Sequence, residues 1–198
     1  MRTFAIIAAG LIIAGPAAAE SWKEYNSPEY GFTVTFPVDP KQENTTYQSA
    51  DGRNVPAHIW SASQNGSTFK VTVAEIGTAG QEDAIIDHAI RSLSQMGEVK
   101  VNFPHRVYQV YGRQISIAAR DGSRETAAVF DLNGRLYQIE AKVLAGGDDT
   151  DLIRFQQSLI FSRDVSNRGQ DVIRNIREAC RGVVNNPAGL DDPRCQRR

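Results

Sequence analysis

Short runs in which apolar and polar residues alternate dominate the middle of this sequence and limit what it can fold into. Phe32, Val34 and Phe36 alternate with threonines, and comparable runs occupy residues 55–60, 69–73, 99–103, 107–117, 125–132 and 136–143. Alternation with a period of two places one apolar face on a β-sheet. Gly-containing turns separate several runs, and Asn133-Gly134, flanked by apolar residues, is the strongest hairpin signal in the chain. The pattern predicts a mainly antiparallel sheet.

One segment interrupts this pattern with a helical period. Residues 81–96 place their apolar side chains on one stripe, with Ile85 at its border: Ile86, Ala89, Ile90, Leu93 and Met96. Acidic residues 82 and 83 suit the first turn of a helix, and Gly97 suits its end. We expect an amphipathic helix that lies on the sheet and leaves His88, on the side opposite the stripe, exposed.

A second helical pattern follows the last alternating run. Leu152, Phe155 and Leu159 form its stripe, and residues 148–150 (Asp-Asp-Thr) supply candidate N-caps. The chain therefore runs in the order strands, helix, strands, helix. This order predicts an α+β fold, with a mainly antiparallel sheet packed against helices, over residues 22–161.

The first 19 residues have the order of an export signal. Arg2 supplies a positive charge, residues 4–13 form an apolar run, and three alanines at 17–19 form a small-residue cleavage site. The apolar run is too short for a bilayer core of about 30 Å, although a retained membrane anchor is the alternative. We expect cleavage after Ala19 and a periplasmic or secreted product with no transmembrane segment. The predicted units are a signal peptide (1–19), an α+β domain (20–162) and a C-terminal extension (163–198).

Both cysteines of the chain belong to the C-terminal extension. Residues 170–184 predict a third helix with Ile173, Ile176, Cys180 and Val183 in line, and Cys195 lies in the irregular tail beyond it. In an oxidising compartment an even pair predicts a disulfide, here between Cys180 and Cys195. It would staple the tail to the third helix. Two unpaired thiols are the alternative.

The charge of the extension differs from that of the rest of the chain. The 198 residues include 22 basic and 23 acidic residues, a near-balance that argues against binding to nucleic acid. Residues 163–198 hold 8 arginines and 5 acids, whereas residues 20–162 hold 13 cations and 18 acids. Arg174, Arg177 and Arg181 recur at helical spacing. They form either a docking face for an acidic partner or anionic lipid, or a solvated helix face on which Arg174 pairs with Glu178.

No residue pattern in the sequence identifies a reaction. His58 lies in a strand pattern and His105 in an expected turn after Pro104; together with His88 they lack metal-ligand spacing. We therefore expect no metal and no cofactor. The hydrolase patterns G-x-S-x-G, S-x-x-K and H-E-x-x-H do not occur in the sequence. The acids at 148, 149 and 151 lack the ligand series of a calcium loop, and helix capping accounts for them.

The two ends of the predicted domain resemble the PsbP/Mog-type superfamily. Residues 22–37 contain W-x-x-Y followed by G-F-x-V-x-F-P, and residues 155–161 read F-x-x-S-L-x-F, similar to the family's final helix and last short strand. The resemblance implies an antiparallel sheet between helices, an α/β/α sandwich. Its members include a photosystem II extrinsic subunit, Ran-binding import factors and many exported bacterial proteins, and they tend to bind rather than catalyse. This chain departs from the pattern after Phe161, and no functional residue is carried over.

These observations favour a non-catalytic exported protein that binds another protein or an envelope component. The alternatives are a small secreted hydrolase whose site is invisible in the sequence, and a structural or stress-related envelope protein. A cleft holding a Ser or His with a shifted pKa would favour the hydrolase. An exposed apolar patch would favour protein binding.

Overall fold

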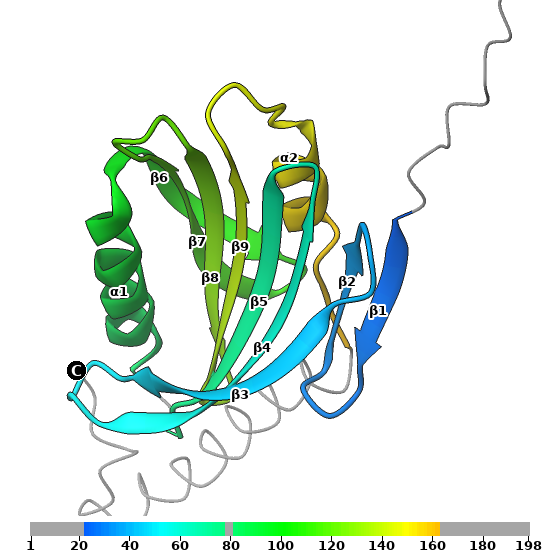
Figure 1. Cartoon of the computed structure of the whole chain (residues 1–198). Coiled ribbons are helices and arrows are strands. Elements are labelled where there is room, and N and C mark those ends of the chain that lie inside the picture. Colours follow the sequence, from blue (N-terminus) through cyan, green and yellow to red (C-terminus); the bar gives the residue numbers. More distant parts are fainter. Residues whose placement is uncertain (1–21, 78–80, 163–198) are drawn as a thin grey trace, which may run out of the picture.

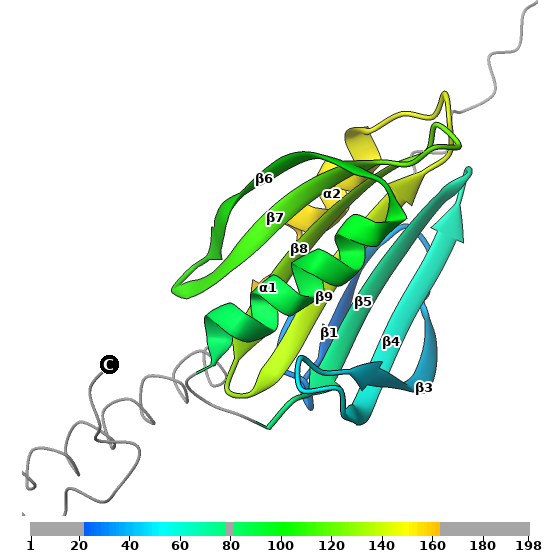
Figure 2. The ribbon, with the colours of Figure 1, turned by 90° about the vertical axis from the view of Figure 1, so that its left-hand side faces the viewer.

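The computed structural model describes residues 22–77 and 81–162 (Figures 1 and 2). Its elements are β1 Lys23–Ser27, β2 Phe32–Phe36, β3 Lys41–Gln48, β4 Asn54–Gln64, β5 Ser67–Glu75, α1 Glu82–Leu93, a 3-10 turn Ser94–Met96, β6 Glu98–Val107, β7 Val110–Ala118, β8 Arg124–Leu132, β9 Arg135–Val143, α2 Thr150–Gln157 and β10 Ile160–Phe161. The described strands form a seven-stranded sheet in the order β3-β4-β5-β9-β8-β7-β6 and a three-stranded sheet in the order β1-β2-β10. The predicted α+β class with a mainly antiparallel sheet is confirmed.

Tight hairpins build the large sheet. The backbone has positive φ at both Asn133 (58°) and Gly134 (74°), and likewise at Asn65 (51°) and Gly66 (78°), as two-residue hairpin turns require. The first turn pairs Leu132 with Arg135 and so sets the register of β8 against β9. After β5, α1 carries the chain across one face of the sheet to the edge strand β6 (Figure 2).

Helix α1 packs on that face through the predicted stripe. Its buried residues Ile85, Ile86, Ala89, Ile90 and Leu93 share one core with Ile115, Ile117, Ala127, Val129 and Leu136 of the sheet. Met96, placed on the same stripe by the sequence, is instead 45% exposed. Residues 94–96 form a 3-10 turn, in which three residues complete a turn, so the α-helical stripe does not continue through Met96.

The opposite face is covered by α2 and the small sheet together (Figure 1). Phe155 of α2 is completely buried, and its ring centroid lies 5.1 Å from that of Phe36 and 5.2 Å from that of Phe69. Phe161 of β10 stacks edge-on against Phe130 at 5.4 Å and Tyr137 at 5.0 Å. The layer on this side therefore consists of a helix and a separate small sheet.

Two strand assignments differ from the sequence-based expectation. No strand was expected at β3, because its residues lack alternating apolar side chains and nearly all are exposed. His105 was expected in a turn after Pro104, but both residues lie inside β6. β6 is an edge strand, where a proline without an N–H group costs no sheet hydrogen bond.

The described residues 22–77 and 81–162 contain no helix long and apolar enough to cross a membrane. The predicted signal peptide, third helix and disulfide lie outside these residues.

Candidate functional site

The site residues proposed from the sequence all fall outside the described residues. Cys180, Cys195, Arg174, Arg177 and Arg181 belong to residues 163–198. The disulfide and the docking face on the third helix therefore remain predictions, as do the unit boundaries near residues 19 and 162.

The three histidines lie on different elements and have different partners. His58 Nδ1 is 2.9 Å from Asn44 Oδ1, and the His105 ring lies 5.7 Å from that of Phe130, where burial lowers the pKa of His105. In the described ranges 22–77 and 81–162, no group of three or more His, Cys, Asp or Glu side chains is placed to hold a metal ion.

His88 is half-buried, although the sequence predicted it to be exposed. Its ring packs edge-on against Tyr47 at 6.3 Å, and Nε2 lies 3.0 Å from the carbonyl oxygen of Gln48. The end of strand β3 therefore lies beside α1 at His88, while Ala84, Asp87 and Arg91 on the same side of the helix stay exposed. The helical period alone could not reveal this, because β3 itself was not predicted.

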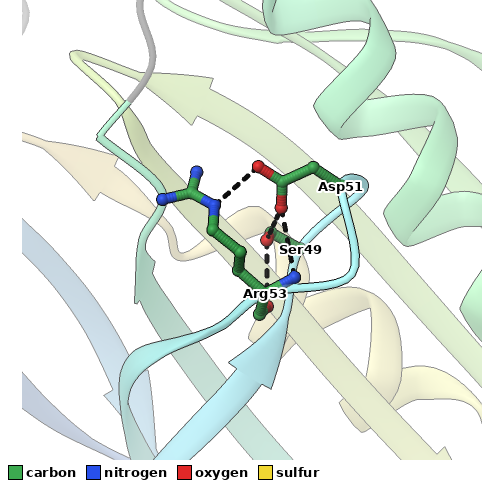
Figure 3. Close-up of polar contacts among 3 residues, drawn as sticks. All are labelled: Ser49, Asp51 and Arg53. Carbon is green, nitrogen blue, oxygen red and sulfur yellow. Dashed lines mark hydrogen bonds and ion pairs between the residues drawn. The ribbon is translucent and has the colours of Figure 1, made fainter.

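Ser49, Asp51 and Arg53 form a polar cluster at the turn between β3 and β4 (Figure 3). Asp51 Oδ1 accepts hydrogen bonds from Ser49 Oγ (2.6 Å) and the Arg53 backbone N–H (3.2 Å), and Oδ2 accepts one from Arg53 Nε (2.7 Å). These bonds lower the pKa of Asp51 to about 2. The cluster staples the Asp51-Gly52 turn, in which Gly52 has a φ of 82°.

This cluster bears on the hydrolase alternative, because a serine, an aspartate and a histidine lie near one another here. His88 is bonded to Gln48, the residue before Ser49. A catalytic triad needs a histidine between the serine and the carboxylate. Here Asp51 binds the Ser49 hydroxyl directly, while His88 binds the Gln48 carbonyl oxygen. Within residues 22–77 and 81–162, the Ser49 hydroxyl is thus bonded to a carboxylate and His88 is bonded elsewhere, which is not the order of a triad.

A pair of buried carboxyls lies on the α1 side of the sheet. Glu125 of β8 and Glu140 of β9 are 8% and 5% exposed, and the two carboxyls are within hydrogen-bonding reach. Glu140 also contacts Lys70 Nζ at 2.9 Å and accepts a hydrogen bond from Gln138 Nε2 at 2.9 Å. Burial, followed by the charge of Glu140, raises the pKa of Glu125 to about 7.

Two carboxyls with one raised pKa are an arrangement found in acid–base enzymes. In this chain neither carboxyl is presented to solvent, and Glu140 is already held by a lysine and an amide. The raised pKa of Glu125 therefore couples the stability of the fold to pH.

An aromatic cluster joins the small sheet to strands β3 and β4. The Tyr25 hydroxyl accepts hydrogen bonds from Trp60 Nε1 and Gln42 Nε2, both at 2.7 Å, and the Tyr30 ring lies 5.1 Å from that of Trp60. A cavity of about 270 Å³ opens beside it, lined in part by Tyr30, His58 and Trp60. Trp60 and Tyr30 are 3% and 7% exposed, so packing already occupies their rings.

A second cavity, an apolar groove of about 270 Å³, lies between α2 and the edge strand β6. Its walls include Val101, Phe103 and Ile153, which are 44%, 41% and 51% exposed. Gln114, Ser116 and Thr126 also line it, and Arg124 Nη2 pairs with Asp149 Oδ1 at 2.6 Å. We call this feature the α2 groove.

The hairpin formed by β6 and β7 presents aromatic and basic side chains to solvent. Tyr108 at its turn and Tyr111 on β7 are 68% and 69% exposed. The Arg106 guanidinium carbon lies 5.7 Å from the centre of the Tyr111 ring, a cation–π contact. The two strands contain three cations (Lys100, Arg106 and Arg113) and one acid, Glu98. Lys100 Nζ lies 2.6 Å from Glu98 Oε2, and Arg113 Nη1 lies 4.0 Å from Asp87 Oδ1 of α1.

Neither the α2 groove nor this hairpin surface was predicted. Alternation identified residues 99–103 and 107–117 as strands, but it did not identify them as neighbours at the edge of the sheet. The signal that was available is the absence of acids from residues 99–118 in an otherwise acidic domain.

Comparisons with known proteins find a likeness among solved structures. Neither a protein-family model nor a curated protein sequence matches this chain. The solution structure of cyanobacterial PsbP (CyanoP) from Synechocystis aligns with a TM-score of 0.48 and 14% sequence identity, covering 75% of this chain and 96% of that one. At these values the likeness carries no argument about what this chain does.

Proposed function

We propose that this chain is an exported, non-catalytic accessory protein that binds an acidic surface of another protein through the β6–β7 hairpin. The observation that carries the proposal is the group of exposed side chains Tyr108, Tyr111 and Arg106 at the turn end of this strand pair. Export rests on the order of residues 1–19, which is that of a signal peptide.

The composition of the hairpin suits protein recognition. Tyrosine and arginine are enriched among the residues that dominate interface energies, because they bury large areas while keeping a polar end. Tyr111 and Arg106 already contact each other, so less side-chain freedom is lost when a partner covers them. Lys100 pairs with Glu98 and Arg113 with Asp87, so the preference for an acidic partner rests on Arg106, whose charge would also speed the approach of that partner.

The alternatives have weaker support in the described residues. The hydrolase reading requires a serine or histidine activated in a cleft, whereas Ser49 is held by a turn and the rings of Tyr30 and Trp60 fill the wall beside His58. A purely structural envelope protein needs no exposed aromatic hairpin, and such exposure carries an aggregation risk.

Site-specific photo-crosslinking in the source cell tests the proposal. A photoreactive phenylalanine analogue replaces Tyr111 in one full-chain variant and Thr45, exposed on the opposite edge strand β3, in a matched control. We expect a protein adduct of one discrete mass from position 111, lost when Arg106→Glu is added, and no such adduct from position 45. Equal adducts from both positions, lipid adducts alone, or none at 111 would contradict it.

A further inference from the structure

The α2 side of the large sheet lacks part of its covering layer. α2 has eight residues and packs on β9, β8 and β5, leaving β7 and β6 beside it. The side chains that line the gap, Val101, Phe103 and Ile153, are apolar and partly exposed. On the opposite face, α1 has twelve residues and packs on both β7 and β8.

The described chain ends on this same face. The ring of Phe161 in β10 stacks on that of Phe130 in β8. In the register of the sheet, Phe130 lies opposite Gly112 of β7, and Gly112 lies opposite His105 of β6. Phe103 of the α2 groove lies two residues along β6 from His105, on the same side of the strand. The chain therefore leaves β10 close to one end of the groove, with residues 163–198 still to follow.

The sequence of those residues fits the gap. Residues 170–184 predict an amphipathic helix with Ile173, Ile176, Cys180 and Val183 on one stripe. The seven residues 163–169 reach up to about 23 Å when extended, enough to begin a helix along β6 and β7. Asp149 lines the groove but is paired with Arg124, so the fit rests on the apolar stripe and not on charge.

We propose that the 170–184 segment of this chain docks in the α2 groove in cis, with its apolar stripe against Val101, Phe103 and Ile153. Docked there, it supplies the missing part of the layer. This inference does not depend on the proposed binding function, because Tyr111 and Arg106 lie on the α1 side of the hairpin.

A disulfide-trapping experiment on the full chain tests the proposal directly. In a Cys195→Ser background, which leaves Cys180 unpaired within the chain, Phe103→Cys places a second cysteine in the groove. Thr45→Cys, on the opposite edge of the sheet, is the matched control. We expect oxidation and non-reducing peptide mapping to give an intramolecular bond between positions 103 and 180, and none between 45 and 180. Bonds between chains, equal bonding in both variants, or no 103–180 bond would overturn the proposal.

Hydrogen exchange provides a test without new cysteines. Ile176→Asp puts a charge on the apolar stripe, whereas Asn175→Asp introduces the same side chain at the neighbouring position, off that stripe. We expect amide exchange in the 98–118 peptides to accelerate about tenfold in Ile176→Asp and to stay unchanged in Asn175→Asp. Equal exchange in both variants and the wild type would also overturn the proposal.

Discussion

The two faces of the large sheet are covered by different means. On one face, α1 packs aliphatic side chains over β7 and β8, and the same face buries a carboxyl pair, Glu125 and Glu140. On the other face, aromatic rings join α2 to a separate small sheet, and a groove remains beside the edge strand. The comparison teaches that the α1 face is complete but sensitive to charge, whereas the α2 face is apolar but incomplete.

Truncating the centre of the aromatic layer should have the largest effect. Phe155→Ala removes a completely buried ring that contacts Phe36 and Phe69, and large-to-small changes of this kind cost about 3–5 kcal/mol. Ile90→Ala on the α1 face falls in a range of about 2–5 kcal/mol and should cost less than Phe155→Ala, because it removes a smaller side chain that is 7% exposed. Chemical denaturation of the two variants measures the loss in the free energy of unfolding on each face. If Ile90→Ala proves the more damaging, the aromatic layer is not the stronger one.

The carboxyl pair should make the α1 face lose stability as the pH rises. The pKa of Glu125 is about 7 in the folded protein and near 4.5 when it is free of these contacts, so between these values the folded state holds a proton that the unfolded state has released. Unfolding then releases a proton, and raising the pH favours it. The free energy of unfolding should fall by up to about 3 kcal/mol from pH 4.5 to pH 8.

The Glu125→Gln variant isolates this effect. In this variant the free energy of unfolding should change less between pH 4.5 and pH 8 than in the wild type. The variant should therefore become more stable relative to the wild type as the pH rises. Denaturation at pH 5 and pH 8 measures both proteins. A variant whose profile runs parallel to that of the wild type would show that Glu125 is not the group that titrates. Asp131, whose pKa is also raised to about 7 by burial, would then be tested by Asp131→Asn.

A smaller effect is expected where the end of β3 lies beside α1. His88→Ala removes the hydrogen bond to the Gln48 carbonyl oxygen and the contact with Tyr47, which should cost about 1 kcal/mol. A fully exposed histidine would change stability by less than about 0.5 kcal/mol. Urea denaturation near neutral pH distinguishes the two results. A loss of less than about 0.5 kcal/mol in the free energy of unfolding would mean that the contact of His88 with β3 does not stabilise the fold.

Local sequence signals were enough for the hairpins and the helix stripe. Asn133-Gly134 sets the register of β8 on β9, and that register already places Glu125 diagonal to Glu140 on one face. Their environment was not predictable, because the partner of Glu140, Lys70 on β5, is distant in the sequence. β3 escaped prediction because a polar edge strand has no apolar alternation.

The candidate binding surfaces could not be read from local patterns for a related reason. The α2 groove exists because the crossover through α1 places β6 at the far edge, while α2 returns to the centre of the sheet. No spacing within residues 98–118 or 150–157 encodes that arrangement. Alternation could assign Val101 and Phe103 to one side of a strand, but not to a side that a short helix leaves uncovered.

Binding through the β6–β7 hairpin is tested most directly by titrating the full chain against the purified protein crosslinked at position 111. Tyr111→Ser should weaken the affinity about tenfold or more, as loss of a dominant interface tyrosine does. Thr45→Ser, on the opposite edge strand, should leave it unchanged. Added salt should weaken the wild type, because Arg106 of the hairpin faces an acidic partner. Equal affinities for the wild type and Tyr111→Ser would contradict the hairpin as the docking surface.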